Sequence, residues 1–240
     1  MSSPRQIVTE FQDYGYFLKL RRGAWFGKLA ESLALSLFSI GYVAEYRAND
    51  IVYSDDQPRG ALMAVLEGTV HGETFDRTGR RVLVCTGPAG TWFGGIAERP
   101  LGDISLTIQA FQPARVWHAP SSALKRLLRE KPELVDSLVE LEARRVNTLI
   151  EMVCVAQRPT ATARIAGSLA LISRIYRDSD VYTETPVIHL TQADLADMTG
   201  HSRQTINAVI AQLQKDQLIK VGHRRIEILD AGRLDAFGDI

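Results

Sequence analysis

The stretch "LTQADLADMTGHSRQTINAVIAQLQKDQLIKVGHRRIEIL", residues 190–229, restricts the possible folds more than any other part of the chain. Thr191 can cap a helix, and Asp194 three residues later completes a capping-box pair. Ala196 is small enough for a second helix to cross at that point. Gly200 then allows the positive φ that a sharp turn between two helices requires. The pattern predicts a helix, a tight turn and a second helix.

The second of these helices has one buried and one open face. Ser202 can cap it, and Ile206 and Val209 supply the buried face. The open face carries polar side chains that suit DNA: Arg203, Gln204, Thr205 and Asn207. Arginine can donate two hydrogen bonds to guanine, glutamine and asparagine can pair with adenine, and threonine suits a phosphate. The arrangement is typical of the recognition helix of a helix-turn-helix, whose N-terminal side chains enter the major groove.

A basic hairpin follows directly after this helix. The stretch "LIKVGHRRIEIL" predicts two short strands around Gly222, the wing of a winged helix-turn-helix. The basic residues of the wing would lie near the DNA backbone and neutralise phosphates: Lys220, His223, Arg224 and Arg225. Polar residues on an exposed helix can also be no more than solvated surface, but the basic hairpin behind the helix favours DNA. Double-stranded DNA is therefore the predicted partner.

The composition limits the class of protein. The 240 residues carry 28 basic and 28 acidic side chains, so any contact with nucleic acid must come from a local patch. The two cysteines, Cys85 and Cys154, lie far apart, which argues against a disulfide framework and favours the reducing cytoplasm. The N-terminus lacks the pattern of a signal peptide, and no apolar run suits a bilayer span, so no membrane partner is expected.

Short β-favouring runs alternate with turn residues between residues 51 and 119. Examples are "ALMAVLEGTV", "RRVLVCTGPAG", "ISLTIQAF" and "ARVWHAP", and "DRTGRR" marks a tight hairpin between two of the strands. Several short strands at this spacing indicate an antiparallel barrel or jelly roll.

The periodicity changes from Pro132 to Ala156, where one long helix is predicted, with Pro132 suited to its first turn. It carries two apolar stripes, the first made of Leu134, Leu138, Leu141, Met152 and Val155, the second of Val135, Val139, Val146, Leu149 and Val153. Two stripes need two partners, of which one can be the β domain and the other the same helix of a second subunit. Burial within one monomer is the alternative, and Arg145 on the first stripe must pair or reach solvent. We favour a homodimer.

The segment "QRPTAT" predicts a hinge, because Pro159 cannot continue a helix and Thr160 can cap the next one. The expected division of the chain is an N-terminal arm (1–24), a β-roll domain (25–130), a dimerisation helix (131–157) and a winged helix-turn-helix domain (158–240). The predicted fold class is α+β, in which a double-stranded β-helix, or jelly roll, precedes the long helix and the winged domain.

This order of segments resembles the CRP/FNR family, the transcription factors related to the cyclic-AMP receptor protein and the fumarate–nitrate reduction regulator. The most specific stretches are "KPELVDSLVELEARRV", "TATARIAGSLALI" and "SRQTINAVIAQLQKDQLI", and the resemblance covers about residues 25 to 230. It implies a sensor roll for a small effector, a homodimer on a near-palindromic DNA site, and RNA polymerase as a partner. It also implies that Arg203 and Gln204 read base edges and that Thr205 contacts a phosphate. Ala208 stands where the cyclic-AMP receptor protein has another arginine, so the half-site should differ.

The stretch "GTWFGGIA" occupies the position of the family's ligand cassette. Cyclic-nucleotide binders of the family have a Gly-Glu pair and an Arg-Ser or Arg-Thr pair there, whose glutamate binds the ribose hydroxyl and whose arginine pairs with the phosphate. This chain has Gly94-Gly95 and Ile104-Ser105 instead. On the long helix, two aliphatic residues replace the hydroxyl residues that meet the adenine. Because burying a phosphate without a cation is costly, the predicted effector is not a cyclic nucleotide.

Other sensors of the family need ligands that this sequence does not supply. An iron–sulfur cluster needs about four thiolates, and two separated cysteines cannot provide them. A haem sensor of the family carries Cys and His in the cassette, and "WFGGIA" has neither. His71 and His118 show no ligand pattern and are interpreted as structural. We predict no haem, no iron–sulfur cluster and no metal site. Cys85 and Cys154 are interpreted as small buried apolar residues, and a redox-sensing thiol stays open as the alternative.

What remains of the cassette predicts a mostly apolar effector pocket with one hydroxyl. Its predicted lining is Trp92, Phe93, Gly94, Gly95, Ile96, Ile104, Ser105, Leu149 and Ile150. Two interpretations stay open: an uncharged or aromatic effector binds there, or these residues fill the core and the regulator needs no effector. An enzyme is not expected, because no cluster of metal ligands and no catalytic motif occurs. A ligand-binding module that acts on a protein partner is a further alternative, against which the base-reading helix argues.

Overall fold

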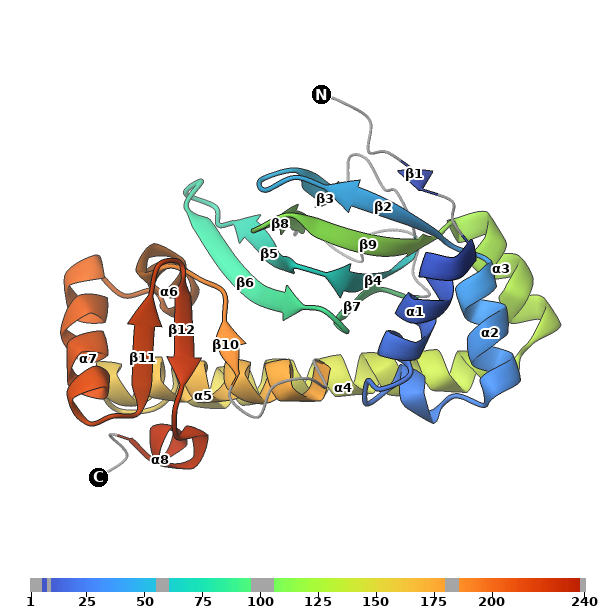
Figure 1. The fold of residues 1–240 in the computed structure, drawn as a ribbon. Coiled ribbons are helices and arrows are strands. Elements are labelled where there is room, and N and C mark those ends of the chain that lie inside the picture. The colour runs from blue at the N-terminus through green and yellow to red at the C-terminus, as the bar shows by residue number, and fades with distance from the viewer. Residues whose placement is uncertain (1–5, 8–9, 55–60, 96–105, 180–185, 238–240) are drawn as a thin grey trace.

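The computed structural model describes residues 6–7, 10–54, 61–95, 106–179 and 186–237 of the chain. Figure 1 shows a β roll above a long helical rod, with a group of helices at one end and a smaller domain of helices and a hairpin at the other. The rod consists of α4 (Glu133–Ala156) followed by α5 (Ala161–Ser179). Helices and antiparallel sheets in this order confirm the predicted α+β fold class.

Two antiparallel sheets build the roll, with the strand orders β1-β2-β9-β4-β7 and β3-β8-β5-β6. The strands are β1 (Gln6–Ile7), β2 (Tyr42–Tyr46), β3 (Ile51–Tyr53), β4 (Leu62–Glu67), β5 (Thr69–Phe75), β6 (Arg81–Pro88), β7 (Trp92–Gly94), β8 (Thr107–Ala110) and β9 (Ala114–Ala119). The predicted hairpin at "DRTGRR" joins β5 to β6 and is confirmed. Its turn places Gly79 at a φ of 79°, a conformation that favours glycine.

Alternation along the strands gives the first sheet two buried faces. In β4, Met63 and Val65 belong to the core between the two sheets, whereas Leu62 and Ala64 belong to the core beneath the helices. Successive side chains of a strand point to opposite faces, so a strand buried on both sides reads as a continuous apolar run. This explains why "ALMAVL" shows no alternation of polar and apolar residues.

Four helical segments cover the outer face of the first sheet (Figure 1): α1 (Glu10–Leu20), a 3-10 helix (Phe26–Lys28), α2 (Glu31–Ser39) and α3 (Ser121–Glu130). Beneath them lies an aromatic cluster with Trp92 at its centre. The Trp92 ring centroid is 4.8 Å from that of Trp25, 5.1 Å from that of Phe26 and 5.7 Å from that of Trp117. Large buried rings with edge and stacked contacts make this the main apolar core of the roll.

The predicted boundary at residue 24 cuts through this core. Tyr16, Phe17 and Leu20 of α1 are buried in the same cluster as the residues of the roll. The Tyr16 hydroxyl accepts a hydrogen bond from Arg115 Nη1 at 2.7 Å and lies 3.1 Å from Glu67 Oε1. The described part of the arm from α1 onward is therefore packed on the roll. Its mixture of aromatic and charged residues reflects one buried and one solvated helix face.

Helix α4 begins directly after Pro132, as predicted, and places its two apolar stripes in different environments. Leu134, Leu138 and Leu141 of the first stripe are buried against the roll and its helices. The second stripe is exposed, with exposed fractions of 55% at Val139, 53% at Val146, 52% at Leu149 and 61% at Val153, and 55% at the neighbouring Ile150. Neither α4 nor any other helix in the described part of the chain is long and apolar enough to cross a membrane.

The winged domain, residues 161–179 and 186–237, has its own apolar core. After α5 it contains β10 (Val187–Ile188), α6 (Gln192–Thr199), α7 (Arg203–Lys215), β11 (Ile219–Gly222), β12 (Arg225–Ile228) and α8 (Ala231–Asp235). The three strands form one antiparallel sheet in the order β10-β12-β11. The Thr160 hydroxyl accepts a hydrogen bond from the Ala163 N–H at 3.0 Å, which confirms the predicted cap of α5.

Candidate nucleic-acid interface

Helices α6 and α7 are joined as the sequence predicts. Thr191 and Asp194 form the predicted capping box, with the Thr191 hydroxyl accepting from the Asp194 N–H at 3.0 Å. Gly200 ends α6 with a φ of 69°, in the left-handed region. The Ser202 hydroxyl caps α7 by accepting from the Thr205 N–H at 3.1 Å. Local hydrogen-bonding rules therefore fix the angle at which α7 leaves the turn.

Helix α7 separates its apolar and polar residues as predicted. Ile206 and Val209 are buried in the core of the winged domain. Arg203, Gln204 and Asn207 are exposed on the opposite side, as is the capping residue Ser202. Thr205 is half-buried, and its hydroxyl lies 2.9 Å from that of Ser202. The open face thus presents a guanidinium and two amides, the groups that can bond the edges of base pairs.

The wing is the hairpin of β11 and β12, in which Gly222 pairs with Arg225 across a two-residue loop. Lys220, His223, Arg224 and Arg225 are all exposed there, as the sequence predicts. Arg224 adopts a φ of 55°, which is uncommon for a residue other than glycine. Its guanidinium contacts the roll: Cζ lies 4.1 Å from the ring centroid of Phe111, and Nη2 donates to the Phe111 carbonyl at 3.1 Å. Sequence reasoning missed this contact.

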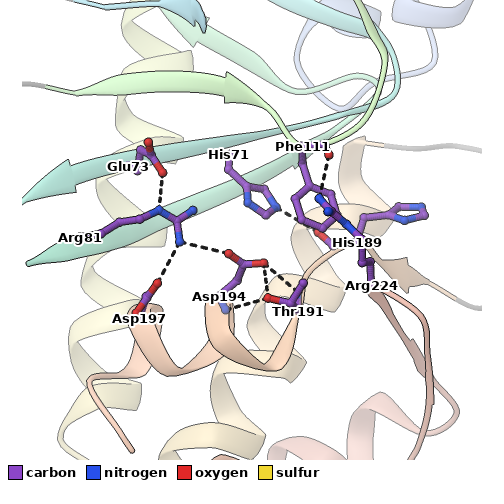
Figure 2. A network of polar contacts seen from close by, with 9 residues as sticks. All are labelled: His71, Glu73, Arg81, Phe111, His189, Thr191, Asp194, Asp197 and Arg224. Carbon is purple, nitrogen blue, oxygen red and sulfur yellow. Dashed lines mark hydrogen bonds and ion pairs between the residues drawn. The ribbon is translucent and has the colours of Figure 1, made fainter. Parts of the chain in front are cut away.

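Arg81 of β6 forms a second contact between the roll and the winged domain, shown in Figure 2. Its Nε donates to Glu73 Oε2 at 2.5 Å within the roll, and its Nη1 lies 3.1 Å from Asp194 Oδ1 and 2.9 Å from Asp197 Oδ2 of α6. Three carboxylates therefore share one guanidinium. The sequence "DRTGRR" predicts a turn, but it does not show which of its arginines contacts another domain.

Asp194 serves the helix cap and the domain contact at once. Burial alone would raise the pKa of its carboxyl group, but hydrogen bonds from the Thr191 side chain and backbone, together with Arg81, hold that pKa below the ordinary 3.8. A carboxyl group with a lowered folded-state pKa stabilises the fold above the unfolded-state value. That contribution disappears as the pH falls through the folded-state value.

We expect Asp194→Asn to lower the free energy of unfolding of the winged domain by about 1–2 kcal/mol at pH 7, because it weakens a helix cap and a charged pair. Urea unfolding measures this. The difference from the wild type should shrink as the pH falls from the unfolded-state value of about 3.9 through the lower folded-state pKa, because the wild-type carboxylate is then protonated as well. Asp197→Asn is the matched control: it touches Arg81 without capping a helix, and a loss equal to that of Asp194→Asn would contradict the role of the cap.

Comparison with known proteins agrees with this geometry. Residues 163–237 match the family model of the Crp-like helix-turn-helix domain. The nitrogen fixation regulation protein FixK of Bradyrhizobium diazoefficiens is 21% identical over 82% of this chain and 82% of its own length. The structure of FixK2 from Bradyrhizobium japonicum has a TM-score of 0.67 at 21% identity, covering 82% of this chain and 96% of that one. A CRP/FNR transcriptional regulator of Thermus thermophilus has a TM-score of 0.59 at 23% identity, covering 81% and 96%.

The chain carries a Crp-like helix-turn-helix domain and is similar to CRP/FNR regulators over about four fifths of its length. It is thus a transcription regulator with a helix-turn-helix DNA-binding domain rather than an enzyme. Helices α6 and α7 and the β11–β12 hairpin all lie within the matched helix-turn-helix domain. The resemblance inferred from the sequence is confirmed.

The described members of the predicted effector pocket do not all lie on one side of the sheet. Trp92 and Phe93 are neighbours in β7 and point to opposite faces. Phe93 packs with the core between the sheets, but Trp92 lies in the aromatic cluster beneath the helices. The prediction that both line one pocket is therefore wrong for Trp92. Ile96, Ile104 and Ser105 lie outside the described residues, so their predicted part in the pocket stays a prediction.

The long-helix part of the predicted pocket is not enclosed within one subunit. Leu149 on the second stripe of α4 and its neighbour Ile150 are both more than half exposed. Their predicted part in an effector pocket stays a prediction.

Arg145 provides the contact of α4 with the cassette. It donates to the Trp92 carbonyl at 3.0 Å, to the Gly94 carbonyl, and to Glu142 Oε1 at 2.7 Å. Burial lowers its pKa, and the carboxylate of Glu142 opposes that effect. A side chain added at Gly95 would meet the carboxylate end of Glu142, which would have to shift. The sequence predicted that Arg145 must pair or reach solvent. The structure pairs it, and a phosphate at this place would have to displace those partners.

The two cysteines lie in different environments. Burial raises the pKa of the Cys85 thiol to about 11, which suits the predicted buried apolar role. Cys154 is exposed on α4, so the prediction that it is buried is wrong. His71 and His118 are buried side chains, with Nε2 atoms 3.0 Å from the His189 carbonyl and 2.9 Å from the Tyr46 hydroxyl. Within the described ranges, no three His, Cys, Asp or Glu side chains gather as metal ligands.

Proposed function

We propose that this regulator binds a near-palindromic DNA site as a homodimer through paired α7 helices. The observation that carries the proposal is the exposure of Arg203, Gln204 and Asn207 on a helix whose opposite face is buried. A helix held in this way can place its first turn in the major groove. The basic wing behind it supplies phosphate contacts that are independent of sequence.

The exposed stripe of α4 supports the homodimer. Val139, Val146 and Val153 are seven residues apart, and Leu149 lies between the last two at coiled-coil spacing. An apolar face along a long exposed helix is typical of a protein interface. In a two-fold dimer each α7 would meet one half-site, with the two helices about 34 Å apart along the DNA. Because its proposed partner is DNA, we also propose that the protein is located in the cytoplasm. Its role in transcriptional control makes RNA polymerase a further proposed partner.

The sensor would act by changing the angle between α4 and α5. These helices meet at the segment around Pro159, and their relative direction sets the spacing of the two α7 helices. An effector can shift this arrangement only if it binds one state more tightly than the other. We place any effector site on the Phe93 side of β7, because Trp92 belongs to the helix-covered core. A regulator without an effector is the second candidate, favoured by the close packing of Arg145 against the cassette.

The effector proposed is not a cyclic nucleotide, and the chain is proposed to hold neither haem nor an iron–sulfur cluster. Arg145 stands beside the cassette, but the carbonyls of Trp92 and Gly94 and the carboxylate of Glu142 already use its donors. We expect isothermal titration with cyclic AMP to give no saturable heat. Saturable binding in the micromolar range would contradict this proposal, as would a visible haem or cluster absorption band in freshly purified protein.

Selection from fragmented genomic DNA tests the proposed function. Bound fragments recovered at physiological salt should share an inverted repeat, and their affinity should fall steeply as salt rises, because phosphate contacts release counterions. A scrambled duplex of equal length and composition is the control. Equal affinity for the selected and scrambled duplexes would exclude sequence-specific binding.

A further inference from the structure

The wing and the sensor roll share an aromatic stack that the sequence does not predict. The Phe111 ring stacks on His71, with 4.3 Å between centroids, and Arg224 of the wing lies over Phe111. His71 in turn lies 3.0 Å from the backbone carbonyl of His189, just before α6 (Figure 2). His71 and Phe111 belong to the roll, whereas His189 and Arg224 belong to the winged domain. The two domains are therefore joined on both sides of the Phe111 ring.

Arg81 joins the same two domains at α6. Its contacts with Asp194 and Asp197 bridge 113 and 116 residues of sequence. We call the packing of the winged domain on the roll the docked arrangement. In it Glu73 and Asp194 are nearly buried, and the guanidinium of Arg81 is the cationic partner of both carboxylates. The Thr86 hydroxyl of β6 also lies 2.8 Å from that of Tyr176 of α5. A docked surface with several buried polar pairs has defined geometry, unlike a nonspecific contact.

Arg224 cannot serve both the roll and DNA. In the docked arrangement its guanidinium stacks on Phe111 and bonds the Phe111 carbonyl. A phosphate contact needs the same planar group and its N–H donors. Arg224 has a positive φ because it lies in the two-residue loop of the wing hairpin, where tight turns use such a conformation.

We propose that this docked arrangement is an autoinhibitory latch, in which Arg81 holds the winged domain on the sensor roll and Phe111 withholds Arg224 from the DNA backbone. DNA and the roll then compete for the wing. The apparent affinity for DNA is lowered by the fraction of molecules that stay docked. Any sensor event that separates the roll from α6 would raise DNA affinity. This inference rests on the proposed DNA-binding function and adds the contact that restrains it.

Two variants release the latch without altering the DNA-facing residues. Arg81→Gln leaves Glu73, Asp194 and Asp197 close together without their cation, and we expect about tenfold tighter binding to the selected duplex. Phe111→Leu keeps an apolar side chain but removes the aromatic face under Arg224, and we expect about threefold tighter binding. Fluorescence anisotropy measures both. Arg80→Gln is the matched control, since Arg80 pairs with Asp76 in the same hairpin, and its affinity should not change.

A double-mutant cycle isolates the contact between Arg224 and Phe111. Arg224→Gln removes the phosphate contact and the stack together, so Phe111→Leu should give no further gain in that background. Solution scattering of the full chain provides a readout without DNA. The radius of gyration should rise in Arg81→Gln and remain unchanged in Arg80→Gln. Thermal unfolding of each variant confirms that the fold is intact.

The outcomes separate the latch from the proposed function. Tighter DNA binding by both variants, with a larger radius for Arg81→Gln, supports the latch. Unchanged or weaker binding by folded variants that do bind the selected duplex overturns it and leaves the proposed function standing. If neither the wild type nor a released variant prefers the selected duplex, the proposed function fails and the latch fails with it.

Discussion

Replacing Val146 and Val153 with glutamate will make the protein monomeric and weaken its binding to the selected duplex by about 100-fold or more. Both valines are more than half exposed on α4, at 53% and 61%. In a coiled coil each would be buried against its counterpart, so glutamates there would place like charges in an apolar seam. In a dimer, binding of one subunit to its half-site gives the second subunit a high effective concentration at the other half-site. Separate monomers lack this advantage and must bind each half-site independently.

Sedimentation equilibrium and anisotropy on the same samples test this prediction. The control is the double variant Ile51→Glu and Phe75→Glu, which adds equal charge at exposed apolar residues of the roll. It should remain dimeric and bind DNA as the wild type does. A dimer that survives the two glutamates on α4, or a wild type that is monomeric at micromolar concentration, would show that the second stripe is not the subunit interface.

Trp117→Ala should lower the free energy of unfolding of the roll by about 3–5 kcal/mol. The Trp117 side chain is 1% exposed, stacks on Phe38 and donates from Nε1 to the Phe38 carbonyl at 3.1 Å. Even a methyl group added at Gly41 would meet the indole ring. The substitution therefore leaves a large cavity in a close-packed site and removes one of the hydrogen bonds to the Phe38 carbonyl, which still accepts from the Gly41 N–H.

Urea unfolding followed by tryptophan fluorescence and by circular dichroism measures the loss. Phe75→Ala is the control, because that ring is 61% exposed and its removal should cost less than about 0.5 kcal/mol. A cost below about 1 kcal/mol for Trp117→Ala would mean that the aromatic cluster is not the main core of the roll.

The winged domain could be predicted from the sequence because its determinants are local. The capping box of Thr191 and Asp194 and the turn glycine, Gly200, act within a few residues of one another. The buried spacing of Ile206 and Val209 acts within one helix. The two stripes of α4 were equally readable, since a period of three and four shows which residues share a face.

The cassette could not be read in the same way. Adjacent side chains of a strand point to opposite faces. When both faces are buried, the strand is apolar throughout, so its sequence does not show which face each side chain occupies. The sequence therefore placed Trp92 beside Phe93 in one pocket, whereas the structure separates them by the thickness of the sheet. Cys154 was misplaced for a related reason: a small apolar residue on a long helix looks the same whether its face is covered or open.

The contacts between the roll and the winged domain depend on how two folded units meet. Nothing in "DRTGRR" distinguishes Arg81, which binds α6, from Arg80, which pairs within its own hairpin. Likewise Phe111 and Arg224 are 113 residues apart, and the sequence marks Arg224 as a basic wing residue without indicating that Phe111 is its partner. These long-range pairs required the structure.

Base reading by α7 is tested most directly by measuring wild type and Arg203→Ala against every single-base substitution of the selected duplex. Loss of the arginine should cost about 1–3 kcal/mol on the intact site and should abolish discrimination at one base pair of each half-site, while discrimination elsewhere persists. Arg203 would instead be a backbone contact if the variant lost the same affinity on every duplex.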